Sequence, residues 1–196
     1  MNTRHDTALA RSYGAVSILL HWLTVFLVIA IFTLALAPGV IKGSIALHGT
    51  LGVLLLALVP LRAAWRMLEG GSIEHPDEPR ALRVLAKAVH GLLYLLLVAV
   101  PVLGLIYVDA KGVPFHFFGA TLPQIAYYSR DFAQAIYGAK TWLAYAMLAL
   151  IFTHAAAAIA WHHFFRRDRV LRGMLVIDAP AAEAPVRVSG LSPSIR

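Results

Sequence analysis

Four long apolar runs without a charged side chain divide the chain. They cover residues 12–41, 43–61, 88–108 and 141–165. Each run meets, the second only just, the roughly 20 residues that a helix needs to cross the hydrocarbon core of a bilayer. The pattern predicts helices near 15–37, 46–66, 84–108 and 140–165, joined by segments punctuated with glycine, proline and charge.

Composition points to the same fold class. Of the 196 residues 60% are hydrophobic and 14% are charged, and the mean hydropathy is +0.73, whereas soluble domains are nearer half apolar and a quarter charged. The apolar part of the first run, about 22 residues long, exceeds the roughly 7–15 apolar residues of a signal peptide. We therefore predict an all-α transmembrane four-helix bundle, with one domain over residues 1–175. The Ala-, Pro- and Ser-rich tail, 176–196, is expected to be disordered.

The basic residues predict the topology. Thirteen Lys and Arg residues belong to the two termini and to the loop after the second span, and four belong to the opposite side. Cytoplasmic segments carry the excess of positive charge, so both termini should be cytoplasmic. The net charge of +7 is thus a topology signal, and we expect the lipid bilayer, and no nucleic acid, as a partner.

Histidines within the spans are the main chemical feature. Six of the nine histidines belong to the spans, namely His21, His48, His90, His154, His162 and His163. His21 should lie roughly 10 Å, and His154 roughly 16 Å, from the cytoplasmic ends of the antiparallel first and fourth spans. An ionisable side chain at membrane depth indicates function, because hydrocarbon offers it no partner.

Two histidines that face each other across a metal macrocycle can both have their ring nitrogens satisfied. Each imidazole gives one nitrogen to the iron and the other to a backbone carbonyl. The chain has no cysteine and its spans lack carboxylates, which favours haem over a bare metal ion. His48 and His90 are shallower, and water at the interface is an alternative partner for them. Small residues in "HGTLG" and "HAAAA" could admit a flat macrocycle or simply allow close helix packing.

Position 140 shares a helix face with His154. It precedes that histidine by 14 residues, nearly four turns, which separates the two by about 21 Å. A helix with ligands at this spacing could hold one haem near each membrane surface. Here position 140 is a lysine.

The chain resembles the bacterial cytochrome b561 family of four-helix, haem-b membrane proteins. The matching stretches are "SILLHWL" (17–23), "LHGTLGVLLLALVPLRAAWR" (47–66), "VHGLLYLLLVAVPVLGL" (89–105), "KGVPFHFFGATLP" (111–123) and "HAAAAIAWHHFFRRDRVLRGML" (154–175). The resemblance implies two b haems, electron exchange with a quinone such as ubiquinone, and a place in the bacterial inner membrane. Some members oxidise superoxide and reduce ubiquinone, and others carry electrons for partner enzymes.

The resemblance also implies site residues. His21 and His154 would ligate the iron of an inner haem, and His48 that of an outer haem whose second ligand would come from position 140. A quinone would bind near His90, Trp161 and His162. The chain departs from the family pattern at Lys140, and at Trp161, where the family has the first of two paired histidines.

These departures leave alternatives open. Lys140 could remove the outer haem, leave it five-coordinate on His48, or ligate it as a neutral amine. The expected function is haem-b electron transfer with the quinone pool, and its electron donor could be superoxide, a periplasmic donor or a partner dehydrogenase. The alternative is a non-redox or single-haem subunit of a larger complex that keeps the fold without the full electron path.

Overall fold

Four long helices form the molecule. A computed structural model describes residues 14–39, 41–69 and 79–159. The helices are α1 (Ala15–Leu36), α2 (Ser44–Leu68), α3 (Arg80–Ala110) and α4 (Arg130–Ile159). All four are long and apolar enough to cross a membrane, and this confirms the four-span prediction. The predicted tail and the last residues of the fourth predicted span lie outside the described residues.

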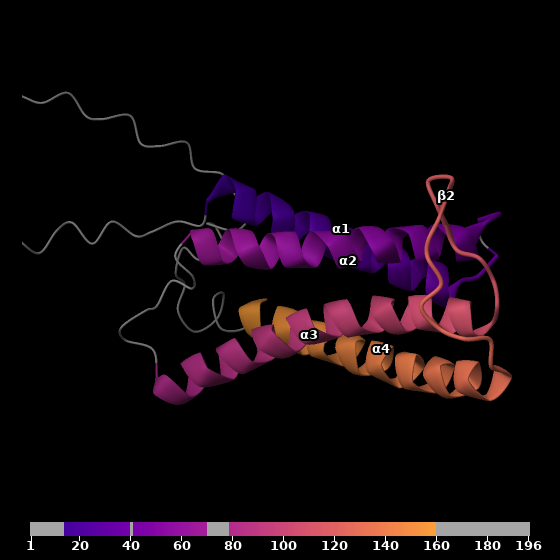
Figure 1. Cartoon of the computed structure of the whole chain (residues 1–196). Coiled ribbons are helices and arrows are strands. Elements are labelled where there is room, and N and C mark those ends of the chain that lie inside the picture. The colour runs from indigo at the N-terminus through magenta and orange to yellow at the C-terminus, as the bar shows by residue number, and fades with distance from the viewer. Residues whose placement is uncertain (1–13, 40, 70–78, 160–196) are drawn as a thin grey trace, which may run out of the picture.

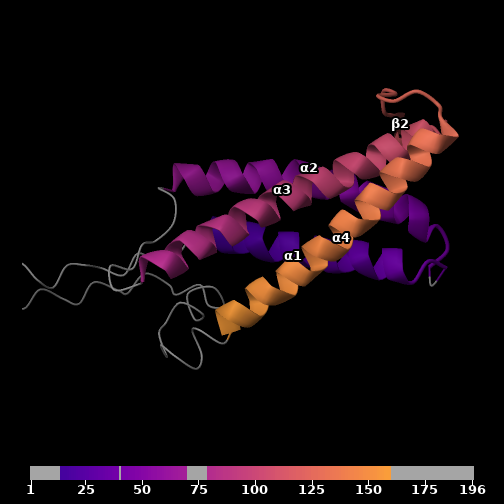
Figure 2. The same ribbon diagram turned by 90° about the horizontal axis from the view of Figure 1, so that it is seen from below.

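Each helix packs against its neighbour in the chain. The close pairs are α1 with α2, α2 with α3, and α3 with α4. The helices run up and down along a common direction, and α4 crosses the others obliquely (Figures 1 and 2). As a result, the ends of α1 and α4 that carry His21 and His154 lie at the same end of the bundle, which we call the His21 end. The opposite end, which carries His48, is the His48 end.

The middle of the bundle is apolar. Every helix contributes to a buried cluster formed by Val28, Leu55, Val59, Leu96, Leu97 and Met147. Many other large apolar side chains on the helices face outward; Leu19 and Phe26 of α1, for example, are 65% and 64% exposed. Outward-facing apolar surface is expected where lipid replaces water as the solvent. The buried cluster separates the polar groups of the His21 end from those of the His48 end.

The fourth helix begins earlier than predicted. It starts at Arg130 and not near position 140, because a charge-free run marks the part of a helix that lipid can surround, and the helix itself can continue into the interface. Lys140 is therefore ten residues inside α4, roughly 15 Å from its start. The prediction that the fourth helix begins at Lys140 is corrected accordingly.

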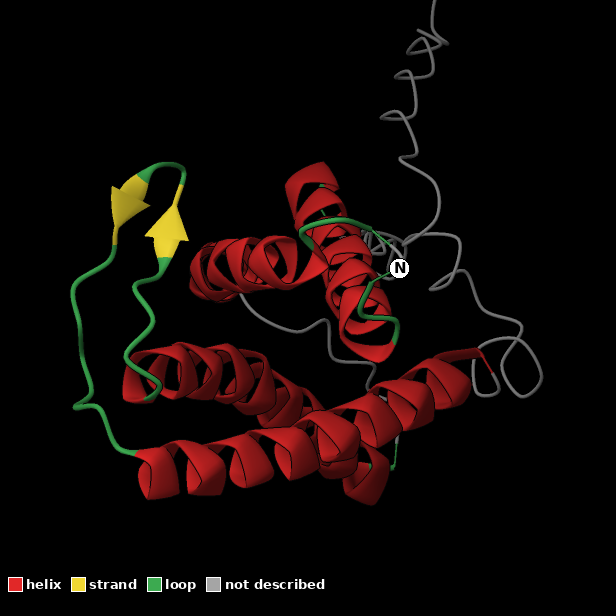
Figure 3. Ribbon diagram, turned by 90° about the vertical axis from the view of Figure 1, so that its right-hand side faces the viewer, coloured by secondary structure: helices red, strands yellow, loops and turns green. Residues whose placement is uncertain are grey.

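A short hairpin joins α3 to α4. Strands β1 (His116–Phe117) and β2 (Ala120–Thr121) are antiparallel, and the tip between them is formed by Phe118 and Gly119, both with positive φ. Seen from the His48 end, the hairpin stands to one side of the helices (Figure 3). Buried Asp109 accepts a hydrogen bond from the backbone N–H of Ile125 (2.7 Å) and so fastens this connection to the end of α3.

Candidate haem-binding sites

Three helices bring their histidines together at the His21 end. The rings of His90 on α3 and His154 on α4 meet edge to face, with centroids 4.8 Å apart. His21 on α1 lies within electrostatic range of both. The structure therefore brings His21 and His154, which were predicted to lie at similar depth on either side of a haem, to the same end of the bundle.

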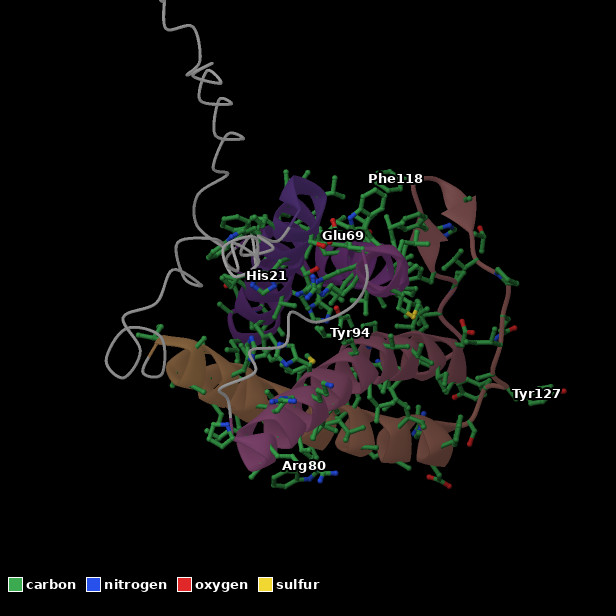
Figure 4. The ribbon with its side chains drawn as sticks, turned by 90° about the vertical axis from the view of Figure 1, so that its left-hand side faces the viewer. His21, Glu69, Arg80, Tyr94, Phe118 and Tyr127 are labelled. Atoms are coloured by element: carbon green, nitrogen blue, oxygen red, sulfur yellow. The ribbon has the colours of Figure 1, made fainter. Side chains whose placement is uncertain are left out.

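Arg62 occupies the place next to His21. Its Nη2 donates a hydrogen bond to Nδ1 of His21 (2.7 Å), and its Cζ lies 5.6 Å from the centre of the Tyr94 ring. Figure 4 looks onto this end of the bundle, with His21 on α1 and Tyr94 on α3. Sequence reasoning counted Arg62 only as a basic residue of the cytoplasmic loop. Its position after a long charge-free run could have marked it as a residue at membrane depth.

His90 is prepared to offer a free nitrogen. Its Nδ1 donates to the carbonyl of Ala86, one turn earlier in α3, at 2.7 Å. This leaves Nε2 with its lone pair, which can accept a proton or ligate a metal. His90 is exposed on the flank of the bundle, where a lipid-soluble molecule could reach it. Trp161 and His162, predicted to lie nearby, fall outside the described residues.

The His48 end holds a second histidine whose Nδ1 is hydrogen-bonded and whose Nε2 is free. Nδ1 of His48 donates to the carbonyl of Ile31 on α1 (3.0 Å), so Nε2 is again the free nitrogen. This is the arrangement that metal-ligating histidines use to hold their ring and tautomer. His48 and Lys140 lie within electrostatic range of each other, and that they form one site stays a prediction.

Lys140 is surrounded by aromatic rings. Its Nζ lies 6.0 Å from the ring centre of Tyr107 and 5.8 Å from that of Tyr137, and the two rings pack together at 5.4 Å. Ring faces attract a cation, so these contacts suit the ammonium form of the lysine. Ligation of iron requires the neutral amine, which these contacts do not favour.

Some of the glycines near the histidines leave room for a planar macrocycle, and one does not. A Cβ built on Gly49 would lie 2.5 Å from Cε2 of Phe115, so that glycine receives a ring from the connection to α4. Nothing lies within 4 Å of a Cβ built on Gly52, one turn after His48, or on Gly91, next to His90. The open surface at Gly52, beside the free Nε2 of His48, fits a planar macrocycle at the His48 end, and the open surface at Gly91 leaves His90 accessible from the flank of α3.

The donor set fits haem better than a bare metal. Within the described residues, no group of three or more His, Cys, Asp or Glu side chains is placed to hold a metal ion. Haem iron is different, because the macrocycle fills four positions and the protein supplies one or two axial ligands. The histidines at both ends of the bundle can supply such ligands.

Comparisons with known proteins agree with this fit. The model of the prokaryotic cytochrome b561 family matches residues 12–176. The chain is 33% identical over 175 residues to cytochrome b561 homolog 2 of Escherichia coli (strain K12), covering 83% of this chain and 90% of that protein. It is 25% identical over 170 residues to probable superoxide oxidase CybB of Yersinia pestis, covering 84% and 96%.

Proposed function

The chain belongs to the prokaryotic cytochrome b561 family, and we propose from this premise that it moves electrons between a donor at the His48 end and a quinone at the His21 end. Family membership makes it a multi-pass bacterial membrane protein of the haem-b electron-transfer type. The finer assignment comes from one observation. Histidines from three helices meet at one end of the bundle, and His48, with its Nδ1 hydrogen-bonded and its Nε2 free, lies at the other.

At the His21 end, His21 and His154 are the proposed axial ligands of a b haem. When bound, this group supplies reversible one-electron chemistry, which no side chain of the described residues offers as readily. The apolar cluster in the middle of the bundle keeps water from the path between the two ends. His48 is the proposed ligand at the other end, with Lys140 at the position where the family resemblance implies its partner.

His90 is the proposed contact for the quinone, a ubiquinone in this assignment. It is exposed on the flank of α3 and its ring touches His154. Its Nε2 can accept a hydrogen bond, and then the proton, from a quinol hydroxyl, because Nδ1 donates to the Ala86 carbonyl. Trp161 and His162 complete the proposed pocket. The bacterial inner membrane, which holds the quinone pool, is the proposed location.

A visible spectrum of the purified protein tests the haem assignment. We expect the sharp bands of reduced low-spin haem b after dithionite treatment and their appearance when a quinol is added. His90→Ala should slow quinol-driven reduction at least tenfold while the haem content stays unchanged. His116→Ala, in the hairpin at the other end, is the matched control. A colourless protein would refute the proposal and favour the non-redox subunit.

Superoxide is a second candidate for the electron donor. A pocket of about 250 Å³ at the His48 end is lined in part by Lys111, Arg130, Tyr107 and Tyr128, and cationic side chains raise the local concentration of an anion. The reaction balances when two superoxide anions each lose one electron to give dioxygen, and one ubiquinone takes two electrons and two protons.

Superoxide-driven quinone reduction tests this candidate. The double variant Lys111→Gln with Arg130→Gln should slow it several-fold and weaken its dependence on ionic strength. The quinol-driven reaction at the other end should be unaffected. Equal rates in the variant and the wild type would leave a protein or another periplasmic donor as the better candidate.

A further inference from the structure

The side chain of Arg62 points into the bundle and not towards the membrane surface. Its guanidinium contacts the His21 imidazole and the Tyr94 ring, and the residue is half-buried. Arg66, one turn later on the same helix, behaves differently, because its Nη1 lies 3.9 Å from Oε2 of Glu69. An arginine near a helix end ordinarily extends towards headgroups, so the inward course of Arg62 calls for a partner inside.

The inner partner of Arg62 is not an acid in the part of the chain that the structure describes. Its contacts there are a neutral imidazole and an aromatic face, and the one ion pair between described residues joins Arg66 to Glu69. A half-buried cation without a counter-charge is costly. Such a residue within a membrane domain indicates an anionic ligand or a functional role.

The hydrogen bond from Arg62 holds His21 in the tautomer that cannot ligate iron through Nε2. A guanidinium has donors and no acceptor, so Nδ1 of His21 must be the acceptor and the ring proton must be on Nε2. A ligating histidine has the opposite arrangement, with Nδ1–H donated and Nε2 free, as His48 already has with Ile31. His21 can therefore ligate iron through Nε2 only after Arg62 has left Nδ1.

We propose that Arg62 is the propionate-binding cation of the His21 end, and that it leaves His21 for a haem carboxylate when the site is filled. The inference rests on the proposed function. Haem b carries two propionate carboxylates, and a guanidinium binds a carboxylate through two parallel hydrogen bonds. Ligation of iron by His21 would free the guanidinium, and a propionate would give it the counter-charge that its contacts with His21 and Tyr94 lack. Arg62 acts as a positioning residue.

The test compares Arg62→Gln, Arg62→Lys and the control Arg66→Gln in the full-length haem-loaded protein. Midpoint potentials come from optical redox titration, and resonance Raman spectra report the propionate bending band. A nearby cation stabilises the reduced haem, which carries one positive charge fewer than the oxidised haem, so loss of the cation should lower the potential. In Arg62→Gln the ratio of reduced to oxidised haem at a fixed ambient potential should fall at least tenfold, about 59 mV for one electron, and the propionate band should shift.

Arg62→Lys should keep most of the potential, because it keeps the charge, but should still shift the propionate band since the two-bond geometry is lost. Arg66→Gln should change neither. If Arg62→Gln cannot hold haem, retention of haem by Arg62→Lys supports the proposal, and loss from both variants would show a packing role and overturn it. An unchanged potential and band in Arg62→Gln would also overturn it. A wild type without haem would instead refute the proposed function.

Discussion

At the scale of single residues, His154 is the side chain on which the His21 end depends. It is half-buried among alanines of α4 and touches His90. We expect His154→Ala to remove an axial ligand and the haem of that end, and to lower the stability of the bundle. Haem per polypeptide, measured as the pyridine haemochrome, should fall by one equivalent. His116→Ala should leave it unchanged, and full retention of a low-spin spectrum in His154→Ala would contradict the assignment.

Lys140 decides what the His48 end can bind. The faces of Tyr107 and Tyr137 stabilise its ammonium form, and an ammonium cannot ligate iron. We expect about two haems per chain in the wild type, the outer one high-spin and five-coordinate on His48 alone, and a change of that haem to low spin in Lys140→His, which would place a second imidazole opposite His48.

The same count distinguishes the other outcomes for Lys140. Two low-spin haems in both proteins, with a spectral change on substitution, would show ligation by the lysine amine. One haem in the wild type, rising towards two in Lys140→His, would show that the lysine removes the outer haem and would contradict His48 as its ligand. Lys140→Met is the control that removes the amine without adding an imidazole.

At the scale of elements, the connection between α3 and α4 depends on Asp109. This buried carboxylate accepts the backbone N–H of Ile125, and hydrogen bonds to charged groups contribute about 1.5–3 kcal/mol. We expect Asp109→Ala to lower the free energy of unfolding by about 1–3 kcal/mol and to speed proteolysis of the hairpin segment. Exposed Gln124, in the same connection, gives the control Gln124→Ala, for which we expect no more than about 0.5 kcal/mol. Equal protease sensitivity of the two variants would contradict this role.

The helices themselves follow from the sequence to different degrees. The spans were predicted because each is apolar around its whole circumference, which a lipid environment requires. The start of α4 was not predicted, because the stretch from Arg130 to Lys140 mixes charged, polar and aromatic residues. Such a mixture does not suit lipid, and a search for lipid-compatible runs therefore assigns it to a loop. The two-residue strands of the hairpin are too short to leave a periodic pattern.

At the scale of the whole molecule, the orientation in the membrane can be measured directly. The chain has no cysteine, so a single introduced thiol can be labelled without background. Phe118 at the hairpin tip is 80% exposed. We expect Phe118→Cys to react with a membrane-impermeant maleimide in spheroplasts, since the positive-inside rule predicts that both termini are cytoplasmic and the hairpin is on the opposite side. Ser189→Cys in the C-terminal tail should react only after lysis. The reverse pattern would invert the topology.

The sequence by itself determined that the chain crosses a membrane four times, which residue types could ligate iron, and how far apart along each helix they stand. These properties depend on the order of residues and on the fixed rise of a helix, so no neighbour is needed to infer them. Rotation of one helix against the next was decided by the tertiary structure alone. It turns His48 onto the Ile31 carbonyl, Lys140 onto a pair of packed tyrosine rings, and Arg62 onto His21. Such contacts join residues from different helices, and they depend on side-chain packing across the interface, which spacing along one chain does not contain.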